Sequence, residues 1–423
     1  MARRRDARRS AVLTAVAAAL VLLPAACTTV SPDPEIEVTE VDGPFVPLDV
    51  TLAGLPPGQE VTLEAATAVG GGVDFVSQAT FTVADDGTVV LAETVPESGD
   101  WESADPTAPL WAMVAESRYY AAMWEEPFVV DLVVRDDAGE ALATTTVERP
   151  GTAPGVESRR VDDRGLVAEY SVPSGLEGRR PALVVFGGSE GGLNTGAGIA
   201  RTVASLGYPA LAISFFGAPG QPENLERVPV ETFLEALRWL RAQPEVDTER
   251  VMTFGVSRGG EMALWLAAER PELVHGAIAP VGAGALVCGV PDYGVPAWTL
   301  DGESLADVCP NYGRVEEMRD AAVDVADIGG PVVLACGGRD ELWPSCDYAQ
   351  HVLDRRGDEE TVLVRHEDAG HAVALPPYVS ISFEEDLYER YDVTSAAVPA
   401  ATHQVRVEFW QAVAATLADL REE

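Results

Sequence analysis

Apolar and polar residues alternate along the first third of the chain, from about residue 45 to residue 148. Period-two alternation is typical of strands that bury one face, and turn-forming residues such as Asp85-Asp86-Gly87 interrupt it at short intervals. The segments with this pattern are residues 48–52, 60–65, 79–83, 88–92, 128–134 and 141–147. So many short strands in about a hundred residues predict an immunoglobulin-like β-sandwich.

Short apolar runs and amphipathic stretches alternate in the rest of the chain. The Pro- and Gly-rich residues 149–155 separate the two patterns, so we expect a sandwich domain at 41–150 and an α/β domain at 151–423. Buried strands are expected at 181–186, 209–214, 251–254, 276–280, 331–336 and 361–365, and helices at 200–206, 230–243, 258–264 and 403–420. Strands that alternate with helices predict a doubly wound, mostly parallel sheet. Residues 282–330 lack either period and predict an insertion over that sheet.

The first 27 residues follow neither pattern. Arginines precede an apolar run at 11–23 that only Thr14 interrupts; it is too short for a stable membrane-spanning helix and is typical of an export signal. Cys27 follows small residues as in a bacterial lipoprotein box, so we expect a signal peptide at 1–27 and a lipid on Cys27. The polar residues 28–40 would then form a tether. The chain is expected to be exported and anchored to the outer face of a bacterial cell membrane.

The net charge of the chain limits the kinds of molecule that it can bind. The formal net charge is −39, and every basic residue other than histidine is an arginine. Such a surface repels nucleic acid and anionic lipid headgroups, so we expect neither as an electrostatic partner. A small-molecule substrate is the expectation that remains.

Four cysteines remain when Cys27 is set aside. An even number in an exported chain favours disulfides, and sequence proximity favours Cys288–Cys309 and Cys336–Cys346, although three pairings are possible. A metal site is the alternative, but no C-x-x-C or paired-histidine spacing supports it. We therefore expect no metal and no cofactor.

The sequence Gly255-Val256-Ser257-Arg258-Gly259 lies between an apolar strand and an Ala/Leu-rich helical stretch. Gly-x-Ser-x-Gly in this setting is typical of a nucleophile elbow, a sharp turn that exposes a serine hydroxyl above a parallel sheet. A side chain at either flanking glycine would collide with a neighbouring strand or helix in so tight a turn. The pentapeptide alone could arise by chance in a chain with 39 glycines, so its setting is what makes Ser257 the predicted nucleophile.

An elbow serine needs an acid and then a histidine, each in a loop after a later strand. His371 follows the last predicted strand and is preceded by Gly370, which lets its loop approach the serine; it is the predicted base. His275 and His351 fit structural or solvated positions better, and His366 ends the strand itself.

Asp340 follows the preceding strand and is the predicted acid, with Glu341 and Asp347 as alternatives. The acid would fix the tautomer of the imidazole, and His371 would take the Ser257 proton.

Oxyanion stabilisation needs two backbone donors. The amide of Arg258, directly after the nucleophile, is one candidate, and Ser189 in the glycine-rich loop 187–192 is the other. A phosphate-binding loop is the alternative for 187–192, but its glycines do not fit Gly-x-Gly-x-x-Gly.

These motifs together resemble the acyl-CoA thioesterase / bile acid-CoA:amino acid N-acyltransferase family. The stretches that carry the resemblance are residues 105–113, 187–193, 215–217, 255–259, 337–345 and 369–371, with Pro376-Pro377. The resemblance spans roughly residues 40 to 420. It implies an immunoglobulin-like domain followed by an α/β-hydrolase domain, with Ser257, Asp340 and His371 as the triad.

The family also implies chemistry. Its N-acyltransferase branch has a cysteine nucleophile, so the serine here favours hydrolysis, and Arg258 stands where the thioesterases often have lysine. Characterised members are intracellular and act on coenzyme A thioesters, whereas this chain begins with an export signal. Three hypotheses follow: a serine hydrolase of an acyl thioester or ester, an exported acyltransferase with the same triad, and a surface binding protein without catalysis.

Overall fold

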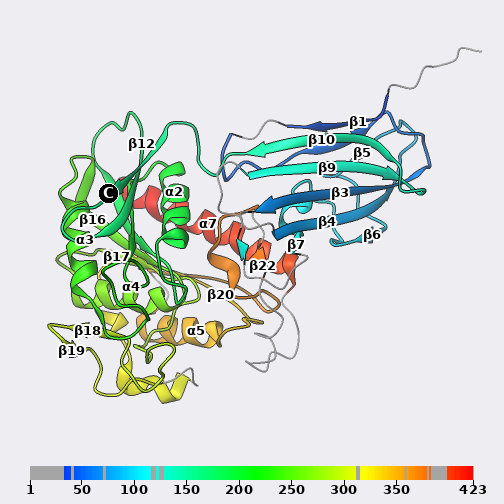
Figure 1. Ribbon diagram of the computed structural model, residues 1–423. Coiled ribbons are helices and arrows are strands. Elements are labelled where there is room, and N and C mark those ends of the chain that lie inside the picture. The colour runs from blue at the N-terminus through cyan, green and yellow to red at the C-terminus, as the bar shows by residue number, and fades with distance from the viewer. Residues whose placement is uncertain are drawn as a thin grey trace, which may run out of the picture.

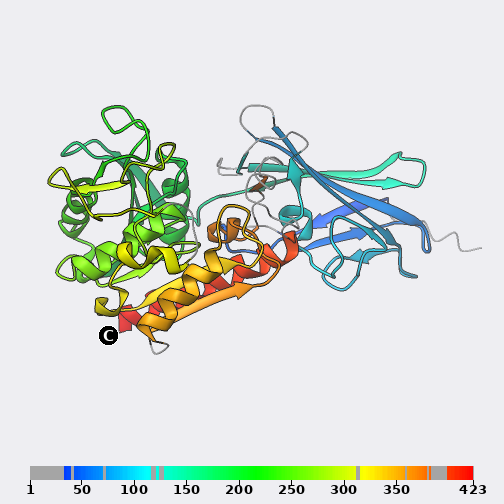
Figure 2. The same cartoon turned by 90° about the horizontal axis from the view of Figure 1, so that it is seen from below.

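The structure is a computed structural model that describes residues 33–39, 42–69, 73–115, 121–122, 128–310, 315–357, 360–378, 381–382 and 398–422. The predicted signal peptide, Cys27 and the first residues of the predicted tether lie outside this range. A β-domain and an α/β domain lie side by side (Figures 1 and 2). Within the described ranges, no helix combines the length and the apolarity that crossing a membrane requires.

The β-domain is a sandwich of two antiparallel sheets, as the alternating pattern predicts. One sheet has the order β1-β2-β5 and the other β10-β9-β3-β4-β6, with β7 also paired to β4. Inward residues such as Leu52 and Leu63 are fully buried between the sheets, and each such side chain stabilises the fold by roughly 1.5–3 kcal/mol. The strands are β1 Glu35–Val38, β2 Val50–Ala53, β3 Glu60–Val69, β4 Val73–Thr82, β5 Val89–Val90, β6 Ser98–Gly99, β7 Val114–Ala115, β9 Phe128–Asp136 and β10 Ala141–Arg149.

The predicted tether at 28–40 is shorter than expected. Residues 35–38 form β1, which pairs with β2 in the sandwich. Acidic residues at alternate positions give this strand its tether-like composition, while Ile36 and Val38 pack against the sandwich core. An edge strand with one solvated face carries little apolar signal.

The α/β domain is built on a sheet of eight described strands in the order β11-β12-β14-β13-β16-β17-β20-β21. Neighbours from β14 to β21 run parallel, so their carboxyl ends lie at one edge. This topology confirms the predicted α/β-hydrolase class. The strands are β11 Val156–Val161, β12 Val167–Pro173, β13 Arg180–Phe186, β14 Ala210–Ser214, β16 Val246–Gly255, β17 Gly276–Ile278, β20 Val332–Gly337 and β21 Thr361–His366.

Helices cover both faces of this sheet because successive strand residues point to opposite sides. Leu183 and Val185 of β13 share a core with α2 and α7, and Val184 and Phe186 share another with α3, α4 and α5. The helices are α2 Asn194–Ser205, α3 Glu231–Arg241, α4 Arg258–Glu269, α5 Ser345–Arg356 and α7 Pro399–Glu422.

Two features of the α/β domain differ from the sequence predictions, and a third agrees with them. Helix α2 begins at Asn194 rather than near residue 200, because Gly196 and Gly198 give its first turns a poor helix propensity that concealed the start. Strands β11 and β12 were not expected; three of the six residues of β11 are charged and four are exposed, so this strand carries little apolar signal. The insertion at 282–330 is largely irregular, as predicted, with short pieces β18 Trp298–Leu300, β19 Glu303–Ser304, η1 Val315–Ala321 and η2 Val325–Asp327.

Helix α7 joins the two domains and runs from the α/β sheet to the sandwich (Figure 2). Its His403 ring stacks on Trp111 of the sandwich domain, with 5.2 Å between centroids and 11° between planes. Trp111 ends the short helix α1 Ala108–Trp111 and donates its indole N–H to Asp105 at 2.9 Å. The conspicuous motif at 105–113 therefore forms a domain interface.

Candidate active site

Ser257 lies at the carboxyl edge of the parallel sheet, between β16 and α4. Its backbone has φ 54° and ψ −118°, a conformation that a non-glycine residue adopts only when its surroundings enforce it. A Cβ at Gly255 would lie 2.2 Å from the carbonyl oxygen of Gly259, and one at Gly259 would lie 2.2 Å from that of Gly187. Both glycines are therefore required sterically, and the turn has the geometry of a nucleophile elbow.

Asp340 and His371 meet at the same edge, after β20 and β21. The Nδ1 atom of His371 lies 2.9 and 2.8 Å from the two carboxylate oxygens of Asp340. Asp340 Oδ1 also accepts the backbone N–H groups of Leu342 and Trp343, at 2.9 and 3.2 Å. The carboxylate is thus fixed by its own turn and held against the imidazole, and Nδ1 is the ring nitrogen that it engages.

Glu341 and Asp347, the alternatives to Asp340, do not bond to the imidazole of His371. Glu341 is 3% exposed, and its Oε2 accepts the backbone N–H of His371 at 2.6 Å, so it holds the histidine backbone rather than the ring. Burial raises the pKa of Glu341, and the neighbouring Asp340 raises it further. Asp347 lies in the first turn of α5. Of the three acids weighed from sequence, Asp340 is the one bonded to the imidazole.

The pKa of His371 is the balance of opposing effects. Burial of the ring lowers it, while the carboxylate of Asp340, by charge and hydrogen bonding, and then those of Glu341 and Glu190 raise it. The carboxylates outweigh burial, and the pKa of His371 is raised above its usual 6.5. This environment stabilises the imidazolium that forms when the ring accepts a proton.

Helix α7 fastens the loop that carries His371. Thr402 Oγ1 accepts the N–H of Gly370 at 3.0 Å, and the buried Arg406 donates Nε to the carbonyl of Ala372 at 2.8 Å. Trp410 donates its indole N–H to the carbonyl of Leu375 at 2.9 Å. Ala372 and Leu375 also pack in the core of the sandwich domain. Sequence reasoning missed these residues because the contacts join segments about thirty positions apart and follow no motif.

The loop 187–192 lies on the other side of Ser257. A Cβ at Gly188 would lie 3.0 Å from the carbonyl oxygen of Val256 and 3.1 Å from Ser257 Cβ, so this glycine lets the loop approach the nucleophile. The N–H of Gly188 donates to both carboxylate oxygens of Glu190, at 3.1 and 3.0 Å. Ser189, predicted from sequence as an oxyanion donor, is exposed within this loop. The sequence analysis did not predict a role for Glu190, because its only distinguishing feature in the sequence is that it is an acidic residue among glycines.

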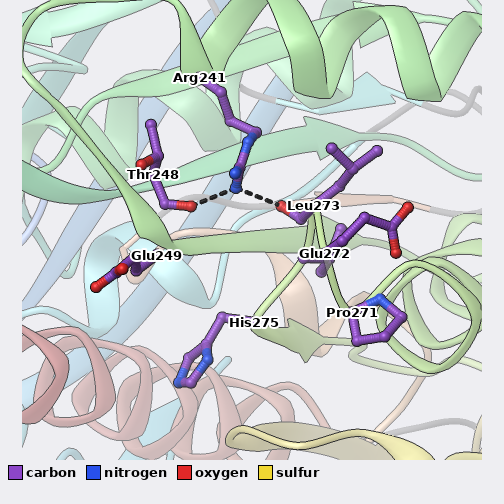
Figure 3. A pocket seen from close by; sticks show the side chains of 8 residues that line it. Arg241, Thr248, Glu249, Pro271, Glu272, Leu273 and His275 are labelled. Atoms are coloured by element: carbon purple, nitrogen blue, oxygen red, sulfur yellow. Dashed lines mark hydrogen bonds between the residues drawn. The ribbon is translucent and has the colours of Figure 1, made fainter.

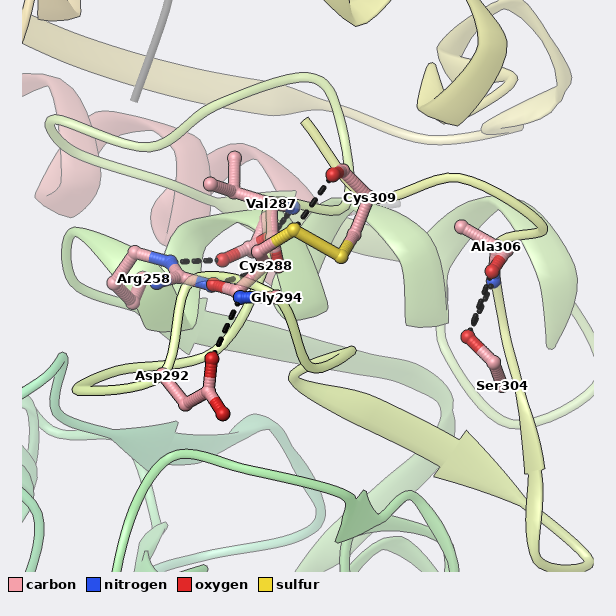
Figure 4. Close-up of a disulfide and its surroundings, with 9 residues drawn as sticks. Arg258, Val287, Cys288, Asp292, Gly294, Ser304, Ala306 and Cys309 are labelled. Carbon is pink, nitrogen blue, oxygen red and sulfur yellow. Dashed lines mark hydrogen bonds and ion pairs between the residues drawn. A yellow bond between two sulfur atoms is a disulfide. The ribbon is translucent and has the colours of Figure 1, made fainter. Parts of the chain in front are cut away.

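Arg258 was predicted to act through its backbone amide, and its side chain has a separate structural role. The guanidinium is buried, pairs with Glu261, and donates to the carbonyls of Val287 and Cys288 at 2.9 and 2.8 Å (Figure 4). Glu261 in turn accepts the N–H of Val287 at 2.6 Å. The start of the nucleophile helix therefore holds the insertion by bonds to its backbone.

Two disulfides lie near this edge, in the pairing that sequence proximity favours. Cys288 and Cys309 close the insertion next to Arg258 (Figure 4). Cys336 in β20 pairs with Cys346 in α5, across the turn that carries Asp340. Among the described residues, no group of three or more His, Cys, Asp or Glu side chains is arranged to hold a metal ion.

A cavity of about 230 Å³ lies at the opposite edge of the sheet (Figure 3). Arg241 lines it and donates to the carbonyls of Thr248 and Leu273. Thr248 lies seven residues before the end of β16, which puts the cavity about 20 Å from the elbow at a strand rise of roughly 3.3 Å. His275 also lines this cavity, His351 lies in α5 and His366 ends β21, so the structure brings none of the three to Asp340.

Comparisons with known proteins agree with this architecture. Residues 46–163 match the family described as "Acyl-CoA thioester hydrolase/BAAT N-terminal region", and residues 228–389 match "BAAT / Acyl-CoA thioester hydrolase C terminal". The two regions together take in well over half of the chain.

Individual relatives cover most of both chains. The chain is 27% identical to acyl-coenzyme A thioesterase 1 of Rattus norvegicus, over 86% of this chain and 91% of the rat protein. It is 28% identical to acyl-coenzyme A thioesterase 6 of Mus musculus, over 87% of this chain and 91% of the mouse protein. Among solved structures, a dienelactone hydrolase-like phosphotriesterase from metagenomic libraries has a TM-score of 0.40 at 19% identity, covering 63% of this chain and 99% of that one.

Proposed function

Since the chain belongs to the acyl-CoA thioester hydrolase and BAAT family, we propose that it hydrolyses an acyl thioester or ester through an acyl intermediate on Ser257. The observation that carries this proposal is the pairing of an elbow serine with a buried His371–Asp340 hydrogen bond at the same sheet edge. A purely structural elbow would not need a histidine whose Nδ1 is fixed by a carboxylate.

In the acylation step, Ser257 Oγ attacks the acyl carbonyl while His371 takes the serine proton. The carbonyl oxygen becomes negatively charged, and backbone N–H groups of Arg258 and of the 187–192 loop are the proposed donors to it. Collapse of the tetrahedral intermediate breaks the bond to sulfur or oxygen. The leaving group departs with the proton from His371, and the acyl group stays on Ser257.

In the deacylation step, a water molecule replaces the leaving group. His371 takes a proton from this water as its oxygen attacks the acyl-serine carbonyl. The bond to Ser257 Oγ then breaks, the proton returns to the serine, and the carboxylic acid is released. Asp340 keeps its charge throughout and stabilises the imidazolium in both steps.

The leaving group is the finer part of the proposal. The basic and apolar N-terminus supports export, where coenzyme A is not expected, and a net charge of −39 repels its phosphates. These properties favour a neutral ester or thioester as the natural substrate, on the same machinery. An acyltransferase that uses another acceptor in place of water is the alternative.

The test compares acyl-CoAs with p-nitrophenyl esters of matched acyl length on the purified chain. We expect turnover of at least one series, loss of that turnover in Ser257→Ala, and fluorophosphonate labelling of the wild-type serine. Ser98→Ala removes a hydroxyl from an exposed position in β6 of the sandwich domain and is the matched control, with activity near that of the wild type. Unchanged turnover in Ser257→Ala, or absence of labelling, would overturn the triad; an acylated acceptor detected by mass spectrometry would favour acyl transfer.

The proposal also covers where the protein is located in the cell. We propose that the chain is exported and anchored through a lipid on Cys27, and the supporting feature is the basic and apolar sequence before that cysteine. Membrane fractionation of a bacterial host that produces the full chain tests this. We expect the chain in the membrane fraction and Cys27→Ser in the soluble exported fraction. Equal distribution of the two proteins would refute the lipid anchor.

A further inference from the structure

The N–H of Gly188 points at the space beside the nucleophile, and a carboxylate of the protein already occupies it. Both oxygens of Glu190 accept this N–H, at 3.1 and 3.0 Å. The position of a Cβ on Gly188 would lie 3.1 Å from Glu190 Oε2 and 3.1 Å from Ser257 Cβ, so the two side chains share one neighbour. The Glu190 carboxylate therefore lies no more than about 6 Å from Ser257 Cβ, the carbon that bears the proposed nucleophilic hydroxyl.

The loop is built to receive this side chain. A Cβ on Gly187 would lie 2.2 Å from Glu190 Oε1, so the absence of a side chain at residue 187 leaves the room that the carboxylate fills. Gly191 follows with φ +68°, packs against the Phe216 ring and turns the chain sharply after Glu190. Glu190 is nevertheless an exposed residue, so it can leave this position without breaking the protein core.

We propose that Glu190 determines specificity in the proposed reaction: it covers the Gly188 N–H in the free enzyme, gives way to a neutral acyl group, and disfavours acyl groups that carry a negative charge near the reacting carbonyl. This inference rests on the proposed hydrolase function. An incoming carbonyl can replace the carboxylate on the N–H, because both are acceptors. A second carboxylate a few ångströms away meets Coulomb repulsion that a neutral chain does not.

The effect of Glu190 on His371 agrees with this placement. The carboxylate is close enough to be among the charges that raise the pKa of His371. Glu190 is therefore close to Gly188 and within electrostatic reach of His371, on the side where the proposed acyl carbonyl would bind.

The experiment measures kcat/KM for two p-nitrophenyl esters of similar length, a neutral butyrate and a hemisuccinate whose acyl chain ends in a carboxylate. Glu190→Gln keeps the shape and removes the charge. We expect it to raise the hemisuccinate-to-butyrate ratio by about tenfold, the size of a like-charge repulsion of somewhat over 1 kcal/mol at a partly solvated site. Glu249→Gln makes the same change at an exposed position by the opposite sheet edge and should leave the ratio as in the wild type.

A second measurement does not depend on turnover. Glu190→Ala uncovers the Gly188 N–H, so a neutral fluorophosphonate should label Ser257 several-fold faster than in the wild-type chain. A wild type that hydrolyses butyrate while Glu190→Gln leaves the ratio unchanged would overturn the role of Glu190 alone. A wild type that neither hydrolyses the esters nor reacts with the probe would overturn the hydrolase proposal itself.

Discussion

The two sides of Ser257 are built in different ways. On one side, Asp340 and His371 are buried and bonded to each other, and helix α7 fixes the histidine loop through three hydrogen bonds made by Thr402, Arg406 and Trp410. On the other side, Gly187, Gly188, Gly191 and Gly192 form most of a loop whose polar side chains are exposed.

The difference matches the tasks proposed for the two sides. Proton transfer requires the base and the acid to be held in one geometry, so burial and multiple anchors are useful there. Oxyanion stabilisation requires backbone N–H groups to come close to the substrate, which large side chains would prevent. The acid–base side is therefore sensitive to loss of charge, and the glycine side to gain of volume.

The largest effect should follow from the acid. Asp340→Asn keeps the shape of the side chain but can hold the imidazole in the wrong tautomer, so we expect kcat to fall by about 10⁴-fold. Steady-state kinetics on the preferred ester measure this. Asp347→Asn, in the first turn of α5, is the matched control; a comparable loss there with activity retained in Asp340→Asn would reverse the assignment.

A smaller but substantial loss should follow from added volume on the glycine side. The new methyl group of Gly188→Ala would lie 3.0 Å from the Val256 carbonyl oxygen and 3.1 Å from Ser257 Cβ, so the loop and the nucleophile must move apart. Contacts of this length open by a few tenths of an ångström, and displacement of a reacting group by about 1 Å can cost about 10²-fold in kcat, so we expect a loss between about threefold and 10²-fold. Gly329→Ala, where a Cβ meets nothing within 4 Å, should have no such effect. Equal kinetics for the two variants would show that the glycine side tolerates volume.

The sandwich domain should have a smaller effect on kcat, which it exerts indirectly through helix α7. Trp111→Ala removes the ring that stacks on His403 of α7, and loss of a buried tryptophan typically costs about 3–5 kcal/mol of stability. We expect kcat to fall by about tenfold as the helix that holds the histidine loop loosens. The melting temperature and kcat are measured on the same preparations. Trp111→Phe is the control, because it keeps an aromatic ring against His403. Normal kcat in a destabilised Trp111→Ala would separate the domain interface from the site.

The smallest effect is a shift in the pH profile. His371 must be neutral to take a proton, and its carboxylate neighbours raise its pKa, so kcat/KM should fall as pH drops through a value above 6.5. Glu341→Gln removes one of those charges, and the acid limb should then move to lower pH. The raised pKa of His371 also affects the free energy of unfolding. The protonated ring contributes its full stabilisation below pH 6.5, and this contribution is lost as the pH rises through the pKa that His371 has in the folded protein. An acid limb below 6.5 in the wild type would contradict the proposed charge balance.

Local patterns predicted much of this molecule. The alternation in residues such as Leu52 and Leu63 marks the sandwich strands, and the order of Ser257, Asp340 and His371 follows from the carboxyl ends of successive parallel strands. Each of these depends on a short window of sequence or on chain order, which the sequence contains directly.

Contacts between distant segments were not predictable. Arg406 meets the carbonyl of Ala372, and Trp111 meets His403, only because two domains and a helix pack together. Glu190 belongs to the same class, because its importance arises from how close Gly188 comes to Ser257 rather than from any spacing. The solvated edge strand β1 was missed for another reason: its alternation covers only four residues, which is too short to separate it from a linker.

The attachment of the histidine loop to α7 also has a consequence for the order of synthesis. A nascent chain that has not reached Trp410 contains Ser257, Asp340 and His371 but lacks the groups that hold the loop from residue 370 to residue 375. Domains fold as their residues emerge, in an exported chain on the far side of the membrane, so the elbow can form before the base is fixed in place. We therefore expect hydrolytic competence to wait for α7, and chains that end before Trp410 to be inert.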